Sequence, residues 1–204
     1  MIEKVDTKGK ILDTAEKLFG LNGFDTVSLR DITTGAGVNL AAVNYHFQSK
    51  DTLVDAVIAR RIEPVNCRRM AMLDALGPNP SVEEILEAFL QPVFEVQVHP
   101  LVPLIGRVMS NPDLFVDRLF NTHLAPVALR FSAALANALP ELPLVDVAWR
   151  LHFSVGVMTH TLLWGKVFPR MTNGLCTIDD REALLRRSVQ FLAAGFRTPA
   201  SNSN

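Results

Sequence analysis

The sequence predicts an all-α fold, and three observations support this prediction. Apolar residues recur at the spacing of a helix, capping residues precede most of the apolar runs, and no alternating run bounded by turns indicates a strand. Hydrophobic residues make up 49% and charged residues 20% of the 204 residues, which excludes wholesale disorder. A chain of this length buries enough surface to fold without a disulfide or a structural metal.

The first two predicted helices have local start and stop signals. Asp6 or Thr7 caps the first helix, and Gly23 ends it because glycine readily adopts the left-handed conformation that follows a helix. Residues 28–31, Ser-Leu-Arg-Asp, are typical of a capping box that begins a second, short helix. The Gly-Ala-Gly segment at 35–37 ends it.

Two further helices follow. Asn39 caps a third helix that reaches about Tyr45, and Ser49 caps a fourth. The fourth helix is long and runs toward Leu76, so we expect Pro64 to kink or divide it. The sequence therefore predicts a compact unit of short helices joined by a long helix to a larger, more apolar bundle.

In the rest of the chain, proline and glycine residues indicate loops, helix starts and kinks. The Gly-Pro-Asn-Pro segment at 77–80 is a loop, and the Ser-Val-Glu-Glu segment at 81–84 caps the next helix. Further helices are expected to begin near Pro100, near 111–112, near Pro143 and at Asp179. Pro92 and Pro126 are expected to kink helices, and the polar tail at 198–204 is expected to be disordered.

Residues 28–47 have the pattern of a helix-turn-helix, which is two short helices joined by a turn that often contains glycine. Gly37 supplies the turn, and apolar residues of both helices are expected to face the core, namely Leu29, Ile32, Val38, Val43 and Phe47. The opposite face of the second helix then carries Asn39, Leu40, Asn44 and Tyr45. Such a face suits base edges and phosphates in a DNA major groove.

At these residues the chain resembles the TetR family of transcriptional regulators. The motifs that carry the resemblance are Gly23-Phe24, 28–32, 36–38, 45–47 and Ser49-Lys50. The resemblance covers about residues 8–56, and it departs from the family where Val43-Asn44 replace a common Leu-Tyr pair. Residues 38–47 together with 149–153 are similar to the fatty-acid-responsive branch. The resemblance implies a DNA-binding domain at 1–52, an effector-binding and dimerisation bundle at 53–197 and the tail at 198–204.

The geometry of the motif divides the expected DNA contacts into two classes. Side chains that hold the phosphate backbone are expected to be Thr26, Ser28, Tyr45, His46 and Lys50. Side chains that face the base edges are expected to be Asn39, Leu40, Ala41 and Asn44. The net charge of −1 means that DNA binding depends on a local surface rather than on the charge of the whole chain.

The apolar bundle is expected to bind an elongated apolar effector with one polar end, such as a fatty acid or an acyl thioester. Arg150 or His152 is the first choice for the polar anchor, with Arg107 and His123 behind them. Apolar side chains expected to line the cavity are Phe89, Met109, Phe120 and Phe153. The alternative interpretation of each aromatic residue is plain core packing.

Two apolar stripes in the last two long helices predict a homodimer. The first stripe contains Val155, Thr159, Leu162 and Leu163, and the second contains Leu184, Leu185, Ser188, Phe191 and Leu192. A dimer would present two recognition helices to two half-sites of an operator.

Other function classes lack their motifs. The sequence has no HExxH, GxSxG, phosphate-binding loop or dinucleotide fingerprint, so it predicts neither an enzyme nor a cofactor. Cys67 and Cys176 have no metal-site spacing, and no signal peptide or membrane span is apparent, so we expect a soluble cytoplasmic protein. The predicted function is a ligand-responsive repressor of double-stranded operator DNA. The alternative is a helical small-molecule-binding protein or enzyme with a vestigial DNA-binding module.

Overall fold

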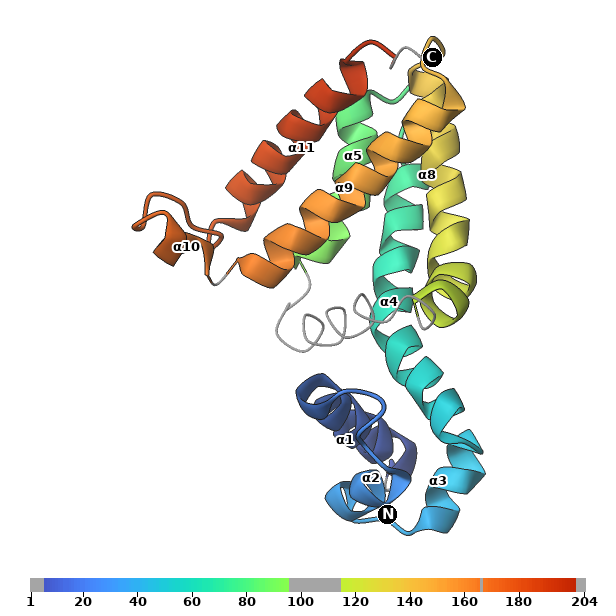
Figure 1. Ribbon diagram of the computed structural model, residues 1–204. Coiled ribbons are helices and arrows are strands. Elements are labelled where there is room, and N and C mark those ends of the chain that lie inside the picture. The colour runs from blue at the N-terminus through green and yellow to red at the C-terminus, as the bar shows by residue number, and fades with distance from the viewer. Residues whose placement is uncertain (1–5, 96–114, 166, 201–204) are drawn as a thin grey trace, which may run out of the picture. The chain divides into compact units, whose positions relative to one another are not determined.

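The computed structural model describes residues 6–95, 115–165 and 167–200, with the side chains of 115–119 excluded. Within these ranges all regular structure is helical (Figure 1), which confirms the predicted all-α fold. The chain divides into two compact units. The first contains Met1–Pro64 and His99–His123, and the second contains Val65–Val98 and Leu124–Asn204.

Three short helices form the N-terminal part of the first unit, and each packs against the other two: α1 (Thr7–Asn22), α2 (Leu29–Ala36) and α3 (Leu40–Phe47). Their apolar faces are buried, and the fully buried side chains include Ile11, Phe19, Ile32, Val43 and Phe47. Burial of these faces stabilises helices that are too short to persist alone.

The helix starts follow the predicted capping residues. The Asp6 carboxylate accepts from the Gly9 amide at 2.8 Å and caps α1. Ser28 and Asp31 form a reciprocal capping box at α2. Gly37 ends α2 with a φ of 63°, a left-handed conformation in which glycine has no Cβ penalty. Each of these boundaries depends on residues within four positions, which explains why the sequence predicts them.

The long fourth helix, α4 (Lys50–Asp74), is capped by Ser49, whose hydroxyl accepts from the Thr52 amide at 3.1 Å. Pro64 lies inside α4 and does not divide the helix, and the kink expected there as the other possibility stays a prediction. The division between the two compact units nevertheless falls directly after this proline. The domain boundary expected at 52–53 stays a prediction.

A π-helix, η1 (Phe115–Leu124), precedes α8 (Ala125–Ala138), and nothing in the sequence pattern predicts this form. Pro126 lies in the first turn of α8, so it does not kink the interior of an α-helix as expected. That position suits proline because the first-turn amides have no intrahelical acceptor. The helix starts expected near Pro100 and near 111–112 lie outside the described residues.

The second unit contains α5 (Val82–Glu95), α8, α9 (Leu144–Trp164), the short α10 (Phe168–Met171) and α11 (Arg181–Arg197). Helix α5 packs against α8 and α11, and α9 packs against the same two helices (Figure 1). Pro143 begins α9 as predicted, whereas Asp180 rather than Asp179 caps α11. The core includes the fully buried Leu86, Leu90, Phe131, Leu135 and Phe196.

The ordered chain continues past the end of α11. The tail expected to be disordered begins at Thr198, yet the Thr198 and Pro199 carbonyls both accept hydrogen bonds from Arg150. Residues 201–204 lie outside the described residues. None of the described helices combines the length and the hydropathy that crossing a bilayer requires.

Candidate functional site

Helix α3 has one buried face and one exposed polar face. Val43 and Phe47 are 1% and 2% exposed and attach the helix to α1 and α2. The other side carries the predicted base-facing residues, and Asn39, Leu40, Ala41 and Asn44 are all exposed. A short helix held by its apolar face, with small and hydrogen-bonding groups opposite, is the form that enters a major groove.

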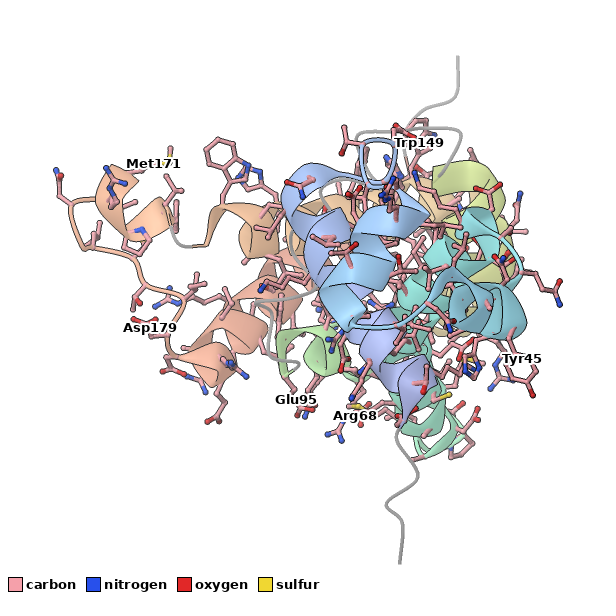
Figure 2. All side chains as sticks on the ribbon, turned by 90° about the horizontal axis from the view of Figure 1, so that it is seen from below. Tyr45, Arg68, Glu95, Trp149, Met171 and Asp179 are labelled. Carbon is pink, nitrogen blue, oxygen red and sulfur yellow. The ribbon has the colours of Figure 1, made fainter. Side chains whose placement is uncertain are left out.

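Tyr45 is the most exposed aromatic residue of this face. Its side chain is 83% exposed, and Figure 2 shows the ring projecting away from the ribbon. Its ring meets the half-buried His46 edge-on at a centroid distance of 5.1 Å. A phenol held outward by a neighbouring ring can donate a hydrogen bond to a phosphate oxygen.

Three of the side chains predicted to contact DNA form hydrogen bonds within the protein. The Asn39 side-chain oxygen accepts from the Ala42 amide at 2.9 Å and caps α3. The Ser28 hydroxyl donates to Asp31 at 2.7 Å, and the Thr26 hydroxyl donates to the Asn22 carbonyl. Hydrogen bonds from Ser28 also lower the pKa of the Asp31 carboxyl, so this capping box stays charged at neutral pH.

Asn44 differs from these three residues. Its side chain is exposed, and no hydrogen bond joins it to another described residue. Both its donor and its acceptor groups therefore face solvent, as bidentate pairing with an adenine edge requires.

Two cationic side chains flank α3 in sequence. Lys50 is the first residue of α4. Its Nζ lies 3.4 Å from the Asp25 carbonyl oxygen, and this contact holds the amine beside the N-terminus of α4. Arg30, which is not among the residues predicted to contact DNA, is exposed in the first turn of α2 and forms no ion pair with the residues described. The sequence signal that could have identified Arg30 as a candidate DNA contact is its position in the first helix of the helix-turn-helix.

The predicted effector residues that the structure describes lie in different local surroundings, and their joint role stays a prediction. Phe89 is 4% exposed and packs edge-on against Phe131 in the core of the second unit, with ring centroids 5.1 Å apart. His152 and Phe153 are exposed on α9, whereas Phe120 and His123 belong to the first unit. Arg107 and Met109 lie outside the described residues.

Arg150, expected as the polar anchor, has a structural role. Its guanidinium donates to four backbone carbonyls at 2.7–3.1 Å, those of Gly195, Phe196, Thr198 and Pro199. These groups lie at the C-terminal end of α11, where carbonyls lack intrahelical donors. Arg150 therefore caps α11 through its Nη1 and Nη2 groups, and its expected role as the anchor of an effector stays a prediction.

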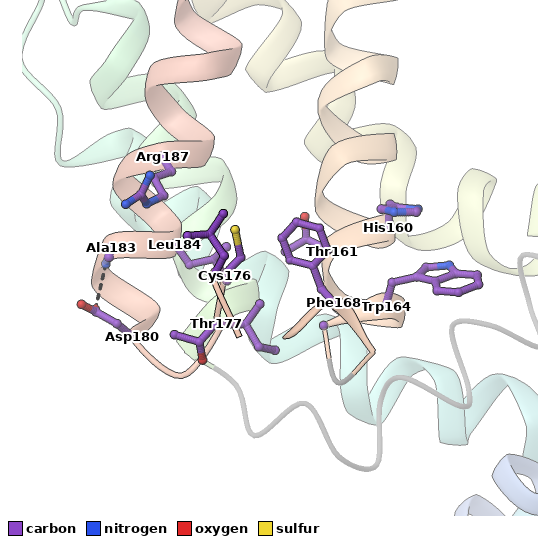
Figure 3. A pocket seen from close by; sticks show the side chains of 13 residues that line it. His160, Thr161, Trp164, Phe168, Cys176, Thr177, Asp180, Ala183, Leu184 and Arg187 are labelled. Atoms are coloured by element: carbon purple, nitrogen blue, oxygen red, sulfur yellow. Dashed lines mark hydrogen bonds between the residues drawn. The ribbon is translucent and has the colours of Figure 1, made fainter. Parts of the chain in front are cut away.

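A cleft of about 640 Å³ opens beside the end of α9, α10 and the start of α11 (Figure 3). Its lining is largely apolar, with His160, Asp180 and Arg187 among the polar side chains. Asp180 is held by its cap bond from the Ala183 amide at 2.9 Å. None of the residues predicted to bind an effector lines this cleft.

The stripes predicted to form the dimer interface mostly face inward. Ser188 and Leu192 are 7% and 5% exposed. Four others are partly buried and pack against the core, namely Val155, Leu162, Leu184 and Leu185, and Thr159 is half-buried. Only Leu163 and Phe191 are exposed, at 38% and 70%. Ser188 and Leu192 are covered within the protomer, because helical spacing identifies an apolar face but not the neighbour that covers it, and the place of these stripes in a dimer interface stays a prediction.

The exposed apolar face of α9 is a different set of residues. Trp149 and Phe153 are 57% and 58% exposed, and their rings lie 5.7 Å apart with His152 beside them. A hollow of about 320 Å³ lies among Trp149, His152, Val145 and Ala148. Exposed aromatic side chains that gather in this way are typical of interaction surfaces.

Metal binding has no support in the ranges that the structure describes. No group of three or more His, Cys, Asp or Glu side chains there could hold an ion. Cys67 is exposed, Cys176 is half-buried, and both thiols are free.

Comparisons with known proteins match both parts of the chain to families of regulators. Residues 11–57 match the family of bacterial regulatory proteins, tetR family, and residues 87–195 match the Tetracyclin repressor-like, C-terminal domain. "Probable HTH-type transcriptional regulator YttP" of Bacillus subtilis is 33% identical over 126 residues, 59% of each chain. IcaR of Staphylococcus aureus, a negative regulator of the biofilm operon icaADBC, is 26% identical over 113 residues, 55% of this chain and 59% of its own. The chain thus spans about six-tenths of the length of these relatives.

Solved structures show the same fold over nearly the whole chain. The fatty acid degradation regulator FadR of Bacillus halodurans has a TM-score of 0.69 at 16% identity, covering 97% of this chain and 100% of its own. FadR of Bacillus subtilis, in complex with stearoyl-CoA, has a TM-score of 0.65 at 16% identity, covering 92% and 98%. The capped helix-turn-helix, the bundle that follows it and the two matched family models lead to one conclusion: this chain belongs to the tetR family of bacterial regulatory proteins.

Proposed function

We propose that this protein is a sequence-specific DNA-binding transcriptional regulator, a repressor that a small apolar effector releases from its operator. The single observation that carries the proposal is the exposed polar face of α3, held by the buried Val43 and Phe47. Because the proposed partner is chromosomal DNA, the protein acts in the cytoplasm.

Side chains around α3 bind two different parts of the DNA, the base edges and the phosphate backbone. Asn44 reads a base edge because its amide is exposed, while Leu40 and Ala41 pack against the groove floor. Tyr45, His46 and Lys50 hold the phosphate backbone. Ser28 and Asn39 contribute through the helix N-termini that they cap, because amides at a helix N-terminus attract phosphate. The exposed Thr26, whose hydroxyl donates to the Asn22 carbonyl, contributes as a neighbouring backbone contact.

A homodimer would present two such faces to the two half-sites of an operator. The exposed aromatic cluster of α9, with Trp149 and Phe153, and the exposed Phe191 of α11 support an interface on these two helices. Replacing Trp149 with Asp should yield a monomer in sedimentation at about micromolar concentration, because a carboxylate would be buried against apolar groups. The matched control is Leu129→Asp on α8, which is 72% exposed and should leave the dimer intact. A wild-type protein that binds DNA as one copy would refute the dimer.

The effector is proposed to be an elongated apolar molecule with one polar end. The largely apolar second unit supports this, as does the fold shared with a regulator solved in complex with stearoyl-CoA. The effector acts by population shift. It binds one separation of the two recognition helices more tightly than another, and it moves the equilibrium by the difference between these affinities.

A gel-shift assay with the DNA upstream of the protein's own gene tests the proposal. The protein should retard one segment in the presence of excess competitor DNA, and an acyl ligand should release it. Failure to retard any segment of the genome in a selection experiment would favour the second candidate, a helical small-molecule-binding protein with a vestigial DNA-binding module.

A further inference from the structure

The core of the second unit contains a cation that has no anionic partner among the residues described. Arg69 of α4 is 4% exposed. Its Nε donates to the Phe89 carbonyl at 2.8 Å, and the guanidinium lies over the Phe89 ring, 4.3 Å from its centroid. Nη1 donates to the Asn66 side-chain oxygen at 3.3 Å, and Nη2 donates to the Met158 sulfur, also at 3.3 Å. Every one of these acceptors is neutral.

The charge on Arg69 persists despite its burial. Loss of solvent lowers the pKa of the guanidinium to about 10, which leaves it protonated at neutral pH. A buried charge without a partner is strongly unfavourable. A guanidinium has five N–H donors, and one of the three bonds formed here goes to a thioether, which is a weak acceptor.

Other shielded arginines of this chain have carboxylates beside them. Arg61, which is half-buried, pairs with Glu16 at 2.5 Å, and the side chain of Arg150 lies 3.9 Å from Asp146. Even the exposed neighbour Arg68 pairs with Glu95 at 2.8 Å. Arg69 is more buried than any of these and forms no ion pair with the residues described.

A purely structural role does not account for the charge. Pro92 has no amide, so the Ala88 carbonyl, next to that of Phe89, lacks its intrahelical donor and the hydrogen bonding of α5 is weakened there. The bond from Arg69 supplies a donor at that point. A neutral donor could do the same without a buried charge, and the remaining donors of Arg69 reach only an amide oxygen and a sulfur.

We propose that Arg69 is the receptor for the anionic head group of the effector, a carboxylate at the end of an apolar chain. The carboxylate takes the Nη donors, and the flexible Met158 side chain moves aside and then packs along the chain. This inference rests on the proposed effector function and deepens it. It selects the free acid over its coenzyme A thioester, because a thioester carbonyl carries no charge to pair with a buried guanidinium.

Three ligands of equal chain length separate the possibilities: oleate, oleyl alcohol and oleoyl-CoA. Titration calorimetry on the full-length protein should show that oleate binds at least about tenfold more tightly than either the alcohol or oleoyl-CoA, since hydrogen bonds to charged groups are the stronger ones. The variant Arg69→Met fills the same volume without charge and should abolish this preference for the acid. The matched control, Arg68→Met, removes the exposed neighbouring cation and should retain it.

Thermal unfolding without ligand adds a readout that distinguishes a structural role. Arg69→Gln, which keeps a neutral donor within reach of the Phe89 carbonyl, should melt at the same temperature as the wild type or higher, because an uncompensated buried charge is removed. A lower melting temperature together with an unchanged preference for the acid would overturn the inference. Should Arg69→Met fail to fold, the wild type still decides, because equal affinity for oleate and oleyl alcohol overturns the proposal.

The DNA assay separates this inference from the proposed function. Release of the operator by oleate and oleyl alcohol at equal concentrations would refute the anion receptor and leave the regulator intact. Selective, Arg69-dependent binding of oleate by a protein that binds no DNA would support the receptor and refute the regulator.

Discussion

Removal of the Lys50 amine tests whether the start of α4 binds the DNA backbone. Lys50 is half-buried, and its amine is held 3.4 Å from the Asp25 carbonyl, so it is ordered before DNA arrives. Each phosphate contact contributes about 0.9 to the slope of log affinity against log salt concentration. The Lys50→Ala dimer lacks two such lysines, so the magnitude of its slope should be smaller by about 1.8. As the salt concentration rises from about 50 to 200 mM, the ratio of the wild-type affinity to the variant affinity should therefore fall about twelvefold.

Fluorescence anisotropy with a labelled operator at four salt concentrations measures this slope. The matched control is Lys17→Ala, which removes an exposed lysine of α1 that we do not assign to DNA. Single-base variants of the operator should all be weakened alike by Lys50→Ala, because a phosphate contact carries no sequence information. An unchanged slope, or a loss confined to one base position, would refute the assignment of Lys50 to a phosphate.

Three further predictions concern recognition, packing and pH. Asn44→Ala should relax preference at one base pair per half-site by about 1–3 kcal/mol, measured over single-base operator variants, and a uniform loss would contradict this role. Phe131→Ala should lower the free energy of unfolding in urea by about 3–5 kcal/mol because Phe131 is fully buried. The exposed control Leu129→Ala should change it by less than about 0.5 kcal/mol, and equal effects would argue against this core. Hydrogen bonds from Arg197 lower the pKa of Glu83 below 4.5, so this pair stabilises the fold above that pH and ceases to do so as the pH falls through the lower folded value. Glu83→Gln should therefore lower the melting temperature at pH 7 and not at acidic pH, and an equal loss at both would contradict the ion pair.

Local chemistry makes much of the first unit predictable from the sequence. Asp6, Ser28 and Asn39 cap their helices through bonds to amides three positions away, and Ser49 does the same at α4. Such bonds depend on adjacent residues alone, so the sequence contains everything that decides them. The exposed face of α3 follows from the same logic, because burial of Val43 and Phe47 leaves Asn44 and Tyr45 outside.

The sequence by itself thus determined the helical class, the helix-turn-helix and the residues of its outer face, because periodicity and capping act within one or two turns. The tertiary structure alone decided which partners the charged side chains of the second unit contact and which of its apolar residues are buried. Arg150 caps carbonyls that lie 45 or more positions away, and Arg69 reaches Met158 across 89 positions. Leu192 faces the core and Trp149 faces solvent although both lie in apolar helical patterns. Periodicity defines a face but not its neighbour, and partners so distant in sequence become neighbours only when the helices pack.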